Sequence, residues 1–421
     1  MKLLIITPYL PYPQDEGGKI RIYNLMRVLH LCGASIDFLS LIYDESELKN
    51  VEAVKKICSS VNVALHKPPP RNRSFISRLN RALTSPPDLM TKRFNSELMK
   101  ITDDILKKNK YDVILIEQLY AAQYITGRGY KNVVLSEHNV ESEIFSRYAH
   151  TKNISSDIQI SRWGLRNNIE VLKLKHHEKK VWREINNILV VSERDRKFIN
   201  NAVGGLNLDI IPNGVDLSDF NSSFKIDNSF ERDIFGGYEN DFKLVFTGSF
   251  THFPNTDAVL YFYHNIFLRL KHLIPNIRFF VVGKNPYPDL IKLSSDDRVI
   301  VTNYVDDVRP YICKSDAFIV PLRIGGGSRL KILQAMGMSK CIVSTSIGAE
   351  GIDCENNKNI LLADSDNDFI NTLIDLSKNR DKADKIGKAA ADLALEKYDW
   401  KSIGRKLFDY LENIKNNVFN N

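Results

Sequence analysis

Residues 321–340 read PLRIGGGSRLKILQAMGMSK and join a strand end, three glycines and a helix start. Glycines permit backbone angles closed to other residues and let a ligand approach the main chain. A helix start adds unpaired N–H groups and the positive end of the helix dipole. With Arg323, Arg329 and Lys331 on the same turn, this pattern predicts a site for a diphosphate, although a tight turn with surface cations is the alternative. A Walker loop and a GxGxxG fingerprint are both absent.

Short apolar runs alternate with amphipathic segments on both sides of this stretch. In the first half the expected strands are 3–7, 36–40, 61–65, 112–116, 132–136 and 187–191. In the second half they are 242–248, 277–283, 298–302, 317–321, 341–345 and 359–363, with helices expected at 255–271, 287–294, 305–313 and 328–337. This alternation predicts βα units on parallel sheets.

The alternation pauses between residues 204 and 241, which are rich in Gly, Asn, Asp and Ser and contain one short strand, LDIIP. A chain of 421 residues is also too long for one ordinary core. We therefore predict an α/β protein with two Rossmann-like, doubly wound domains, at 1–204 and 205–396. Residues 397–421 carry no strand signal and are expected to be helical.

The amino-acid composition and the cysteine content restrict the class of protein. With 43% apolar and 26% charged residues the chain is typical of globular proteins, and no apolar run is long enough for a membrane-spanning helix. The start, MKLLIITPYLPYP, is interpreted as a buried strand rather than a signal peptide, because Thr7-Pro8 breaks its apolar core. Five cysteines without a CxxC pair argue against a disulfide framework or a zinc site and favour a reducing cytosol.

The net charge of +7 indicates an anionic partner without naming it, and we predict no nucleic acid partner. Residues 67–110 hold eleven Lys or Arg against four Asp or Glu, and residues 162–197 hold ten against five. Each stretch is interpreted either as a solvated helix face or as a patch that rests on an anionic membrane surface.

Two further loops follow predicted strands, at the edge where open parallel sheets bind ligands. Gly17 and Gly18 precede a helix with Lys19 and Arg21 in its first turn. The segment EHNVES places His138 at a strand's carboxyl end, either as a structural histidine or facing a ligand.

Acidic pairs are interpreted as helix caps. Asp306 and Asp307 are expected to cap the helix that begins near Val305. The stretch 364–366 reads DSD, which matches a metal-binding DxD spelling, but a helical pattern follows it and favours N-capping acids. We predict no metal and no other cofactor.

Together these motifs resemble the family-four glycosyltransferases of the GT-B fold, a large retaining group. The resemblance covers nearly the whole chain and depends on the order and spacing of the motifs. They are TPYLPYPQDEGGKIR, EHNVES, VVSERD, IIPNGVDLSDF, FTGSFTHFPNTDAV, VVGKNP, VTNYVDDVRPYI, PLRIGGGSRLKILQAMGMSKCIVSTSIGAEGI and YDW.

The resemblance implies a nucleotide-sugar donor, a UDP- or GDP-sugar, held mainly by the second domain. It implies a glycan or lipid-linked saccharide acceptor held mainly by the first domain, and metal-independent transfer with retention. The helix after YDW, within 397–421, would cross back to the first domain. Surface polysaccharide biosynthesis, in the cytoplasm or peripherally at the inner face of the plasma membrane, is the expected setting.

The resemblance also implies roles for single residues. His138 is expected to orient the transferred sugar, and Arg323 and Lys331 to neutralise the diphosphate leaving group. The residues expected to bind the donor are Gly17, Gly18, Gly248, Val305, Gly326, Gly327, Ser328 and Gln334.

Two features depart from the family's pattern. Gly326 and Gln334 stand where many relatives carry two glutamates, although a subgroup with the GGGSRLK form also lacks the first. Glutamine keeps an acceptor for ribose hydroxyls but loses a charge-assisted hydrogen bond, a loss of about 1 kcal/mol. Many relatives also carry an Arg and a Lys soon after Gly248, so here Arg323 and Lys331 would have to supply that charge.

Two rival functions stay open. An inverting GT-B transferase would use an acid of the first domain as base, and Glu117 at the end of DVILIEQ is the candidate. A non-catalytic nucleotide-sugar or glycan-binding protein would bind the donor without turnover, as the changes at Gly326 and Gln334 suggest.

Overall fold

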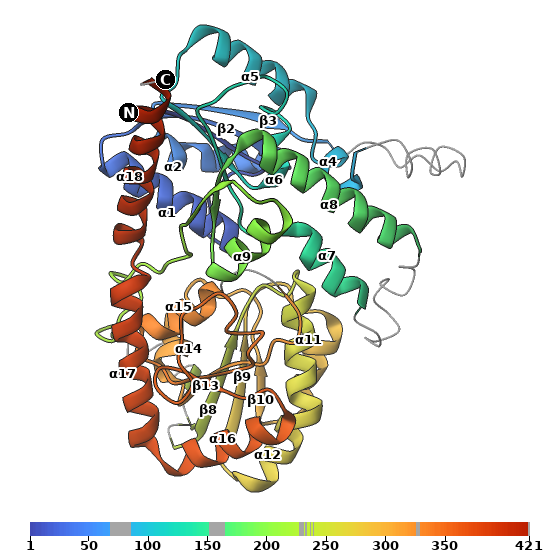
Figure 1. Ribbon diagram of the computed structural model, residues 1–421. Helices are drawn as coiled ribbons and strands as arrows, with labels where there is room; N and C mark the ends of the chain where they lie inside the picture. The colour runs from blue at the N-terminus through green and yellow to red at the C-terminus, as the bar shows by residue number, and fades with distance from the viewer. Residues whose placement is uncertain are drawn as a thin grey trace. The chain divides into compact units, whose positions relative to one another are not determined.

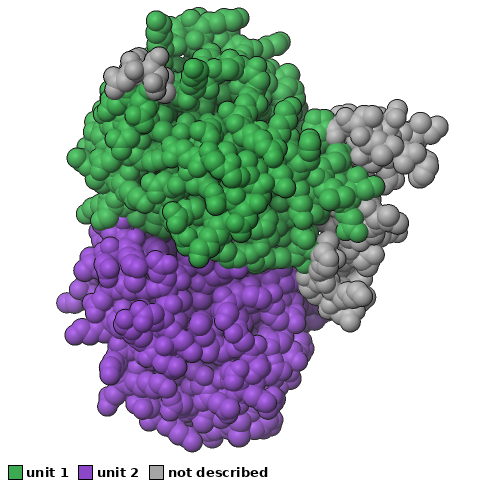
Figure 2. All heavy atoms as spheres, viewed as in Figure 1, with its two compact units in different colours: residues 1–212, 401–421 green, residues 213–400 purple. Residues whose placement is uncertain are grey.

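The structure is a computed structural model that describes residues 1–67, 86–150, 165–226, 231, 234–235, 237–238, 240–325 and 329–419 (Figure 1). The chain divides into two compact units (Figure 2). Unit 1 comprises residues 1–212 and 401–421, and unit 2 comprises residues 213–400.

Unit 1 is built on a seven-stranded sheet in the order β3-β2-β1-β4-β5-β6-β7, in which every neighbouring pair is parallel. The strands are β1 (Lys2–Thr7), β2 (Ser35–Ile42), β3 (Ser60–Leu65), β4 (Val113–Glu117), β5 (Val133–Ser136), β6 (Asn187–Val190) and β7 (Asn207–Ile210). Because β7 pairs with β6, unit 1 extends to Pro212 and not only to residue 204, the limit expected from composition.

The helices of unit 1 connect these strands and end with the C-terminal helix. They are α1 (Gly17–Leu31), η1 (Glu45–Asn50), α2 (Val51–Lys55), α4 (Asp88–Thr91), α5 (Ser96–Lys108), α6 (Leu119–Ala122), α7 (Glu141–His150), α8 (Leu165–Ile185), α9 (Glu193–Ala202) and α18 (Trp400–Phe419). Helix α18 packs against α1, since a Cβ on Gly404 would lie 2.4 Å from Val28 Cβ. Lys406 of α18 also donates a hydrogen bond to the Ile210 carbonyl at 2.7 Å.

Unit 2 is built on a six-stranded parallel sheet in the order β10-β9-β8-β11-β12-β13. Its strands are β8 (Phe242–Thr247), β9 (Ile277–Val282), β10 (Val299–Val301), β11 (Ala317–Val320), β12 (Ile342–Ser344) and β13 (Leu361–Leu362). Its helices are α11 (Phe253–Phe262), η3 (Tyr263–Phe267), α12 (Leu268–Leu273), α13 (Pro288–Ile291), η4 (Lys292–Ser295), α14 (Arg309–Lys314), α15 (Leu330–Gly337), α16 (Asp366–Lys378) and α17 (Arg380–Lys397).

The sheet of unit 2 lies between a layer with α14, α15 and α17 and a layer with α11 and α12 (Figure 1). This covering explains why its strands are apolar on both faces, as in parallel sheets generally. Helix α14 begins later than the pattern from Val305 predicts, because Asp307 accepts hydrogen bonds from the main chain and side chain of Arg309. None of the described helices is long and apolar enough to cross a membrane.

The strand order reverses once in each sheet, between β1 and β4 in unit 1 and between β8 and β11 in unit 2. The connections on either side of such a reversal run to opposite faces of the sheet, and ligands of open α/β sheets bind there, beyond the carboxyl ends of the strands. These two points position the residues described next. The prediction of two doubly wound parallel α/β domains is confirmed.

Candidate active site

Lys331 of α15 lies at the reversal point of unit 2, beside the end of β8. Its Nζ donates a hydrogen bond to Asn255 Oδ1 at 2.8 Å and lies 3.9 Å from the ring centroid of Phe246. A Cβ on Gly248 would lie 3.0 Å from this Nζ and 2.9 Å from Asn255 Nδ2, so the contact requires a residue without a side chain. The structure therefore brings together Gly248 and Lys331, which the sequence predicted from separate motifs.

The amino group of Lys331 is largely shielded from water and lacks a carboxylate partner among the described residues. Its partners among the described residues are an amide and an aromatic ring, and neither carries a negative charge. Burial lowers the pKa of Lys331 well below its usual value, and the charge of Arg329 lowers it further. A bound anion would supply the missing opposite charge and stabilise the protonated form.

Arg323, which follows β11, differs from Lys331 because it already has a carboxylate partner. Its guanidinium donates to both oxygens of Asp257 on α11, at 3.1 Å and 2.5 Å, and lies 4.4 Å from the ring centroid of Tyr261. The Asp257 side chain is 3% exposed, whereas that of Arg323 is 44% exposed. The positive charge of Arg323 is thus largely compensated within unit 2, while its outer face stays open to solvent.

The remaining predicted residues of unit 2 have simpler surroundings. Val305, between β10 and α14, is half-buried and packs against the core of unit 2. Gln334 is half-buried on α15, one turn after Lys331, and its side chain has no hydrogen-bond partner among the described residues. Gly326, Gly327 and Ser328 lie outside the described residues.

His138 lies at the reversal point of unit 1, where the segments after β1, β4 and β5 meet. Its Nε2 is 2.7 Å from Glu117 Oε2, and its Nδ1 is 2.9 Å from Gln118 Nε2. The same amide nitrogen donates to the hydroxyl of Tyr9. Glu117 is only 2% exposed and His138 is buried as well. Both ring nitrogens of His138 therefore have protein partners.

The glycine loop of unit 1 reaches this same cluster. Gly18 lies in the first turn of α1, which begins at Gly17, and a Cβ on Gly18 would lie 2.0 Å from the Tyr9 hydroxyl oxygen. The two basic side chains of that turn, Lys19 and Arg21, are bound to other protein groups. Lys19 pairs with Asp15 at 3.0 Å, and the buried Arg21 donates to the carbonyls at 211 and 212, each at 2.8 Å.

Helix α8 holds the EHNVES segment that carries His138. Trp182 Nε1 donates to Glu137 Oε1 at 2.9 Å, and Glu178 Oε1 accepts from Ser142 N at 3.0 Å. The second bond satisfies a main-chain N–H in the first turn of α7, which has no partner within the helix. Burial raises the pKa of Glu178 to about 7 and the pKa of Glu137 well above its usual value.

The DxD-like stretch has structural partners. Ser365 caps α16 in a capping box with Asp368, so the serine and not a neighbouring aspartate is the cap. Asp364 accepts from Ser346 N at 2.7 Å, and Asp366 accepts from the Tyr261 hydroxyl. In the part of the chain that the structure describes, no group of three His, Cys, Asp or Glu side chains could hold a metal ion.

Four residues of the candidate site were not predicted from the sequence. Asn255 and Asp257 lie in FPNTDAV directly after β8, so their place beyond a strand end could have indicated them. Tyr9 follows β1 in the same way. Gln118 gave no signal, because its distinguishing feature is a backbone with φ 70° and ψ 148°, which costs about 1–3 kcal/mol in a residue other than glycine.

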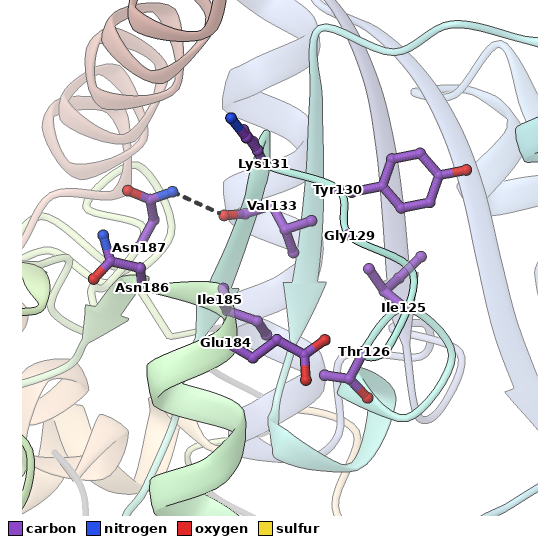
Figure 3. A pocket seen from close by; sticks show the side chains of 10 residues that line it. All are labelled: Ile125, Thr126, Gly129, Tyr130, Lys131, Val133, Glu184, Ile185, Asn186 and Asn187. Atoms are coloured by element: carbon purple, nitrogen blue, oxygen red, sulfur yellow. Dashed lines mark hydrogen bonds between the residues drawn. The ribbon is translucent and has the colours of Figure 1, made fainter.

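Unit 1 also contains a pocket of about 350 Å³ (Figure 3). It lies at the amino ends of β5 and β6, where Asn187 Nδ2 donates to the Val133 carbonyl at 3.1 Å. Its lining residues are Ile125, Thr126, Gly129, Tyr130, Lys131, Val133, Glu184, Ile185, Asn186 and Asn187. None of them is a predicted site residue, and ligands of parallel sheets bind at the opposite edge, so we assign no function to this pocket.

Comparison with known proteins finds a family match within unit 2 and a relative along nearly the whole chain. Residues 241–379 match the model of the family "Glycosyl transferases group 1". The chain is 23% identical over 97% of its length to an uncharacterized 44.6 kDa protein in the cps region of Klebsiella pneumoniae, 99% of which is covered.

Two solved structures share the fold. Sucrose-phosphate synthase from Thermosynechococcus elongatus superposes with a TM-score of 0.71 at 12% identity, over 98% of this chain and 99% of that one. Anabaena HepE in complex with UDP-glucose has a TM-score of 0.67 at 14% identity, over 98% and 100% of the two chains. Residues 241–379, which lie in unit 2, thus match the model of a glycosyltransferase family, and the whole chain shares the two-domain fold of these solved structures.

Proposed function

We propose that the protein transfers a sugar from a nucleoside-diphosphate sugar to a glycan or lipid-linked saccharide, with retention and without a metal. The observation that carries this proposal is the Lys331 ammonium, which lies beside Gly248 at the reversal point of unit 2 without a negative partner among the described residues. When the bond between the anomeric carbon and the diphosphate breaks, negative charge grows on the leaving oxygen. A fixed cation in a partly dry site stabilises that charge most where it is largest.

A UDP-sugar is the first donor to test, because the structurally similar HepE was solved with UDP-glucose. The description of the Klebsiella relative, which places it in a cps region, supports surface polysaccharide biosynthesis as the setting. Within unit 2, Gln334 lies one turn after Lys331, and its amide has no hydrogen-bond partner among the described residues, so it can accept or donate a hydrogen bond at the nucleoside end of the donor.

The decisive experiment is a thermal-shift panel of UDP-, GDP-, dTDP- and ADP-sugars, without metal and then with EDTA. We expect one nucleotide to raise the melting temperature, equally with EDTA, in the wild type but not in Lys331→Met. Lys358→Met is the matched control, because Lys358 is an exposed lysine of unit 2 that pairs with Glu355 at 2.8 Å. A shift that needs metal would contradict the cationic site, and no shift with any nucleotide would favour a non-catalytic or acceptor-dependent protein.

Inversion is the second candidate, favoured by the hydrogen bond between Glu117 and His138. Both side chains are buried, Glu117 at 2% and His138 at 8% exposure, so in an inverting enzyme they would act as a pair, with the less buried His138 as the base and Glu117 as its orienting partner. The anomer of the first product, read by proton NMR before it equilibrates, separates the two mechanisms. An anomer opposite to that of the donor would overturn retention.

Attachment to the cytoplasmic face of an anionic membrane is proposed from the basic stretches of unit 1. Residues 68–85 of the first stretch and 162–164 of the second lie outside the described residues. The described part of α8 exposes Leu172 beside several lysines, a pattern that suits an anionic lipid surface. Flotation with vesicles that contain anionic lipid should show salt-sensitive binding, and equal flotation with neutral vesicles would contradict the proposal.

A further inference from the structure

We propose that Gln118 is a positioning residue of the transfer site: its amide holds His138 in one tautomer and joins the segments after β1, β4 and β5. The inference rests on the proposed function for its role in sugar transfer. Its geometric basis is independent of any ligand, because Gln118 Nε2 contacts both His138 Nδ1, at 2.9 Å, and the Tyr9 hydroxyl.

The amide determines where His138 carries its proton. Gln118 Nε2 has two hydrogens and no lone pair to offer, so His138 Nδ1 has to accept. The ring proton then lies on Nε2, which donates to Glu117 Oε2 at 2.7 Å. Burial lowers the pKa of His138 even though Glu117 acts in the opposite direction. The ring is therefore neutral at pH 7, in the one tautomer that satisfies both partners.

The backbone of Gln118 indicates that this arrangement is imposed. Its φ of 70° with ψ of 148° lies in a region that is populated almost only by glycine. A residue with a side chain persists there when the surrounding contacts determine its position, and such residues gather at functional sites. Glycine would adopt this backbone without strain but would leave His138 Nδ1 and the Tyr9 hydroxyl without their donor.

The same amide supports the glycine loop. A Cβ on Gly18 would lie 3.3 Å from Gln118 Nε2 and 2.0 Å from the Tyr9 hydroxyl oxygen. Segments that begin far apart in the sequence thus meet on one side chain, at the reversal point where open sheets bind ligands. A change at Gln118 is expected to displace His138 and the start of α1 together.

The test compares Gln118→Gly and Gln118→Glu with two matched controls. Asn186→Gly replaces another residue of unit 1 with positive φ, and Gln123→Glu makes the same chemical change at the end of α6, where the amide contacts only the Tyr120 carbonyl among the described residues. Each protein is characterised by thermal unfolding, by nitrogen-15 NMR of labelled histidines, and by kcat/KM with the donor found in the nucleotide panel.

In the wild type we expect His138 Nδ1 to resonate as an unprotonated nitrogen. Gln118→Glu should place a second carboxylate on the ring and raise the pH at which His138 loses its proton by about 1–3 units. Gln118→Gly relieves the backbone strain but removes two hydrogen bonds, so its melting temperature should stay close to that of the wild type, while kcat/KM falls on the order of 100-fold. Both controls should keep wild-type kcat/KM and His138 resonances.

Two results would overturn the inference: a wild-type ring protonated at Nδ1, or variants whose kcat/KM falls only as far as their thermal stability does. The NMR result requires no donor. If no nucleotide sugar bound to any variant, the proposed function would fail, while the Gln118–His138 assignment would still be decided by the resonances.

Discussion

The stability of unit 1 is expected to depend on pH through Glu178, the α8 residue that holds the start of α7. Its side chain is 1% exposed and accepts from Ser142 N at 3.0 Å. Burial raises its pKa from 4.5 to about 7. At about 1.4 kcal/mol per pKa unit, ionising this carboxyl group costs about 3 kcal/mol more in the folded state than in the unfolded chain.

The sign follows from which state binds more protons. Because the folded pKa is raised, the folded chain keeps the proton of Glu178 between pH 4.5 and about 7, where the unfolded chain has lost it. The contribution is fully present below pH 4.5 and is lost as the pH rises through about 7. For a unit of roughly 200–250 residues, 1 kcal/mol corresponds to about 2–4 °C, so ionisation of Glu178 should lower the melting temperature by about 6–12 °C as the pH rises through this range.

The variant Glu178→Gln isolates this effect, because its amide oxygen still accepts from Ser142 N but does not titrate. Melting temperatures measured from pH 5 to pH 8 should be similar for the two proteins at pH 5, with the variant more stable at pH 8. Glu170→Gln, on the same helix but partly exposed and paired with Lys173 at 3.1 Å, is the control. Parallel curves for wild type and Glu178→Gln would refute the reasoning.

Three further predictions concern the candidate site. Lys331→Met removes a charge-assisted contact of about 1.5–3 kcal/mol and should weaken donor binding about 10- to 100-fold in calorimetric titration; an unchanged Kd would exclude Lys331 from the site. Gln334→Glu should bind the donor several-fold more tightly, a gain of about 1 kcal/mol, and weaker binding would show that the nucleoside end does not contact this position. Gly18→Ala should lower thermal stability by about 1–3 kcal/mol, because its Cβ would lie 2.0 Å from the Tyr9 hydroxyl oxygen, and Tyr9→Phe in the same chain should recover part of the loss. Equal melting of Gly18→Ala and wild type would contradict that contact.

The strands could be predicted because strands buried on both faces of a parallel sheet are continuous apolar runs. Residues 3–7 and 242–248 correspond closely to β1 and β8. The C-terminal boundary of the main segment of unit 1 was harder to predict. LDIIP was recognised as a strand, but its pairing with β6 was not. Pairing between β6 and β7 depends on how distant segments meet, which a local apolar pattern does not encode.

The candidate site was predicted to the extent that its motifs are local. Glycines before a helix and cations in its first turn indicated Lys331 and Gly18, and the structure places each at a reversal point of its sheet. The pairing of Arg323 with Asp257 was not predicted, because 66 residues separate the two side chains. The DSD stretch was correctly interpreted as the start of a helix, although Ser365 is the cap.

The sequence by itself determined the two parallel α/β domains, the glycine loops and the resemblance to GT-B glycosyltransferases, since these depend on residue type and spacing along the chain. Only the tertiary structure decided that Arg323 has a buried carboxylate partner while Lys331 has none among the residues that the structure describes, and that Gln118 assigns the proton of His138. The physical reason is that charge compensation and tautomers depend on which polar atoms lie within about 3 Å of each other. Here those atoms come from segments that the fold, and not the local sequence, brings together.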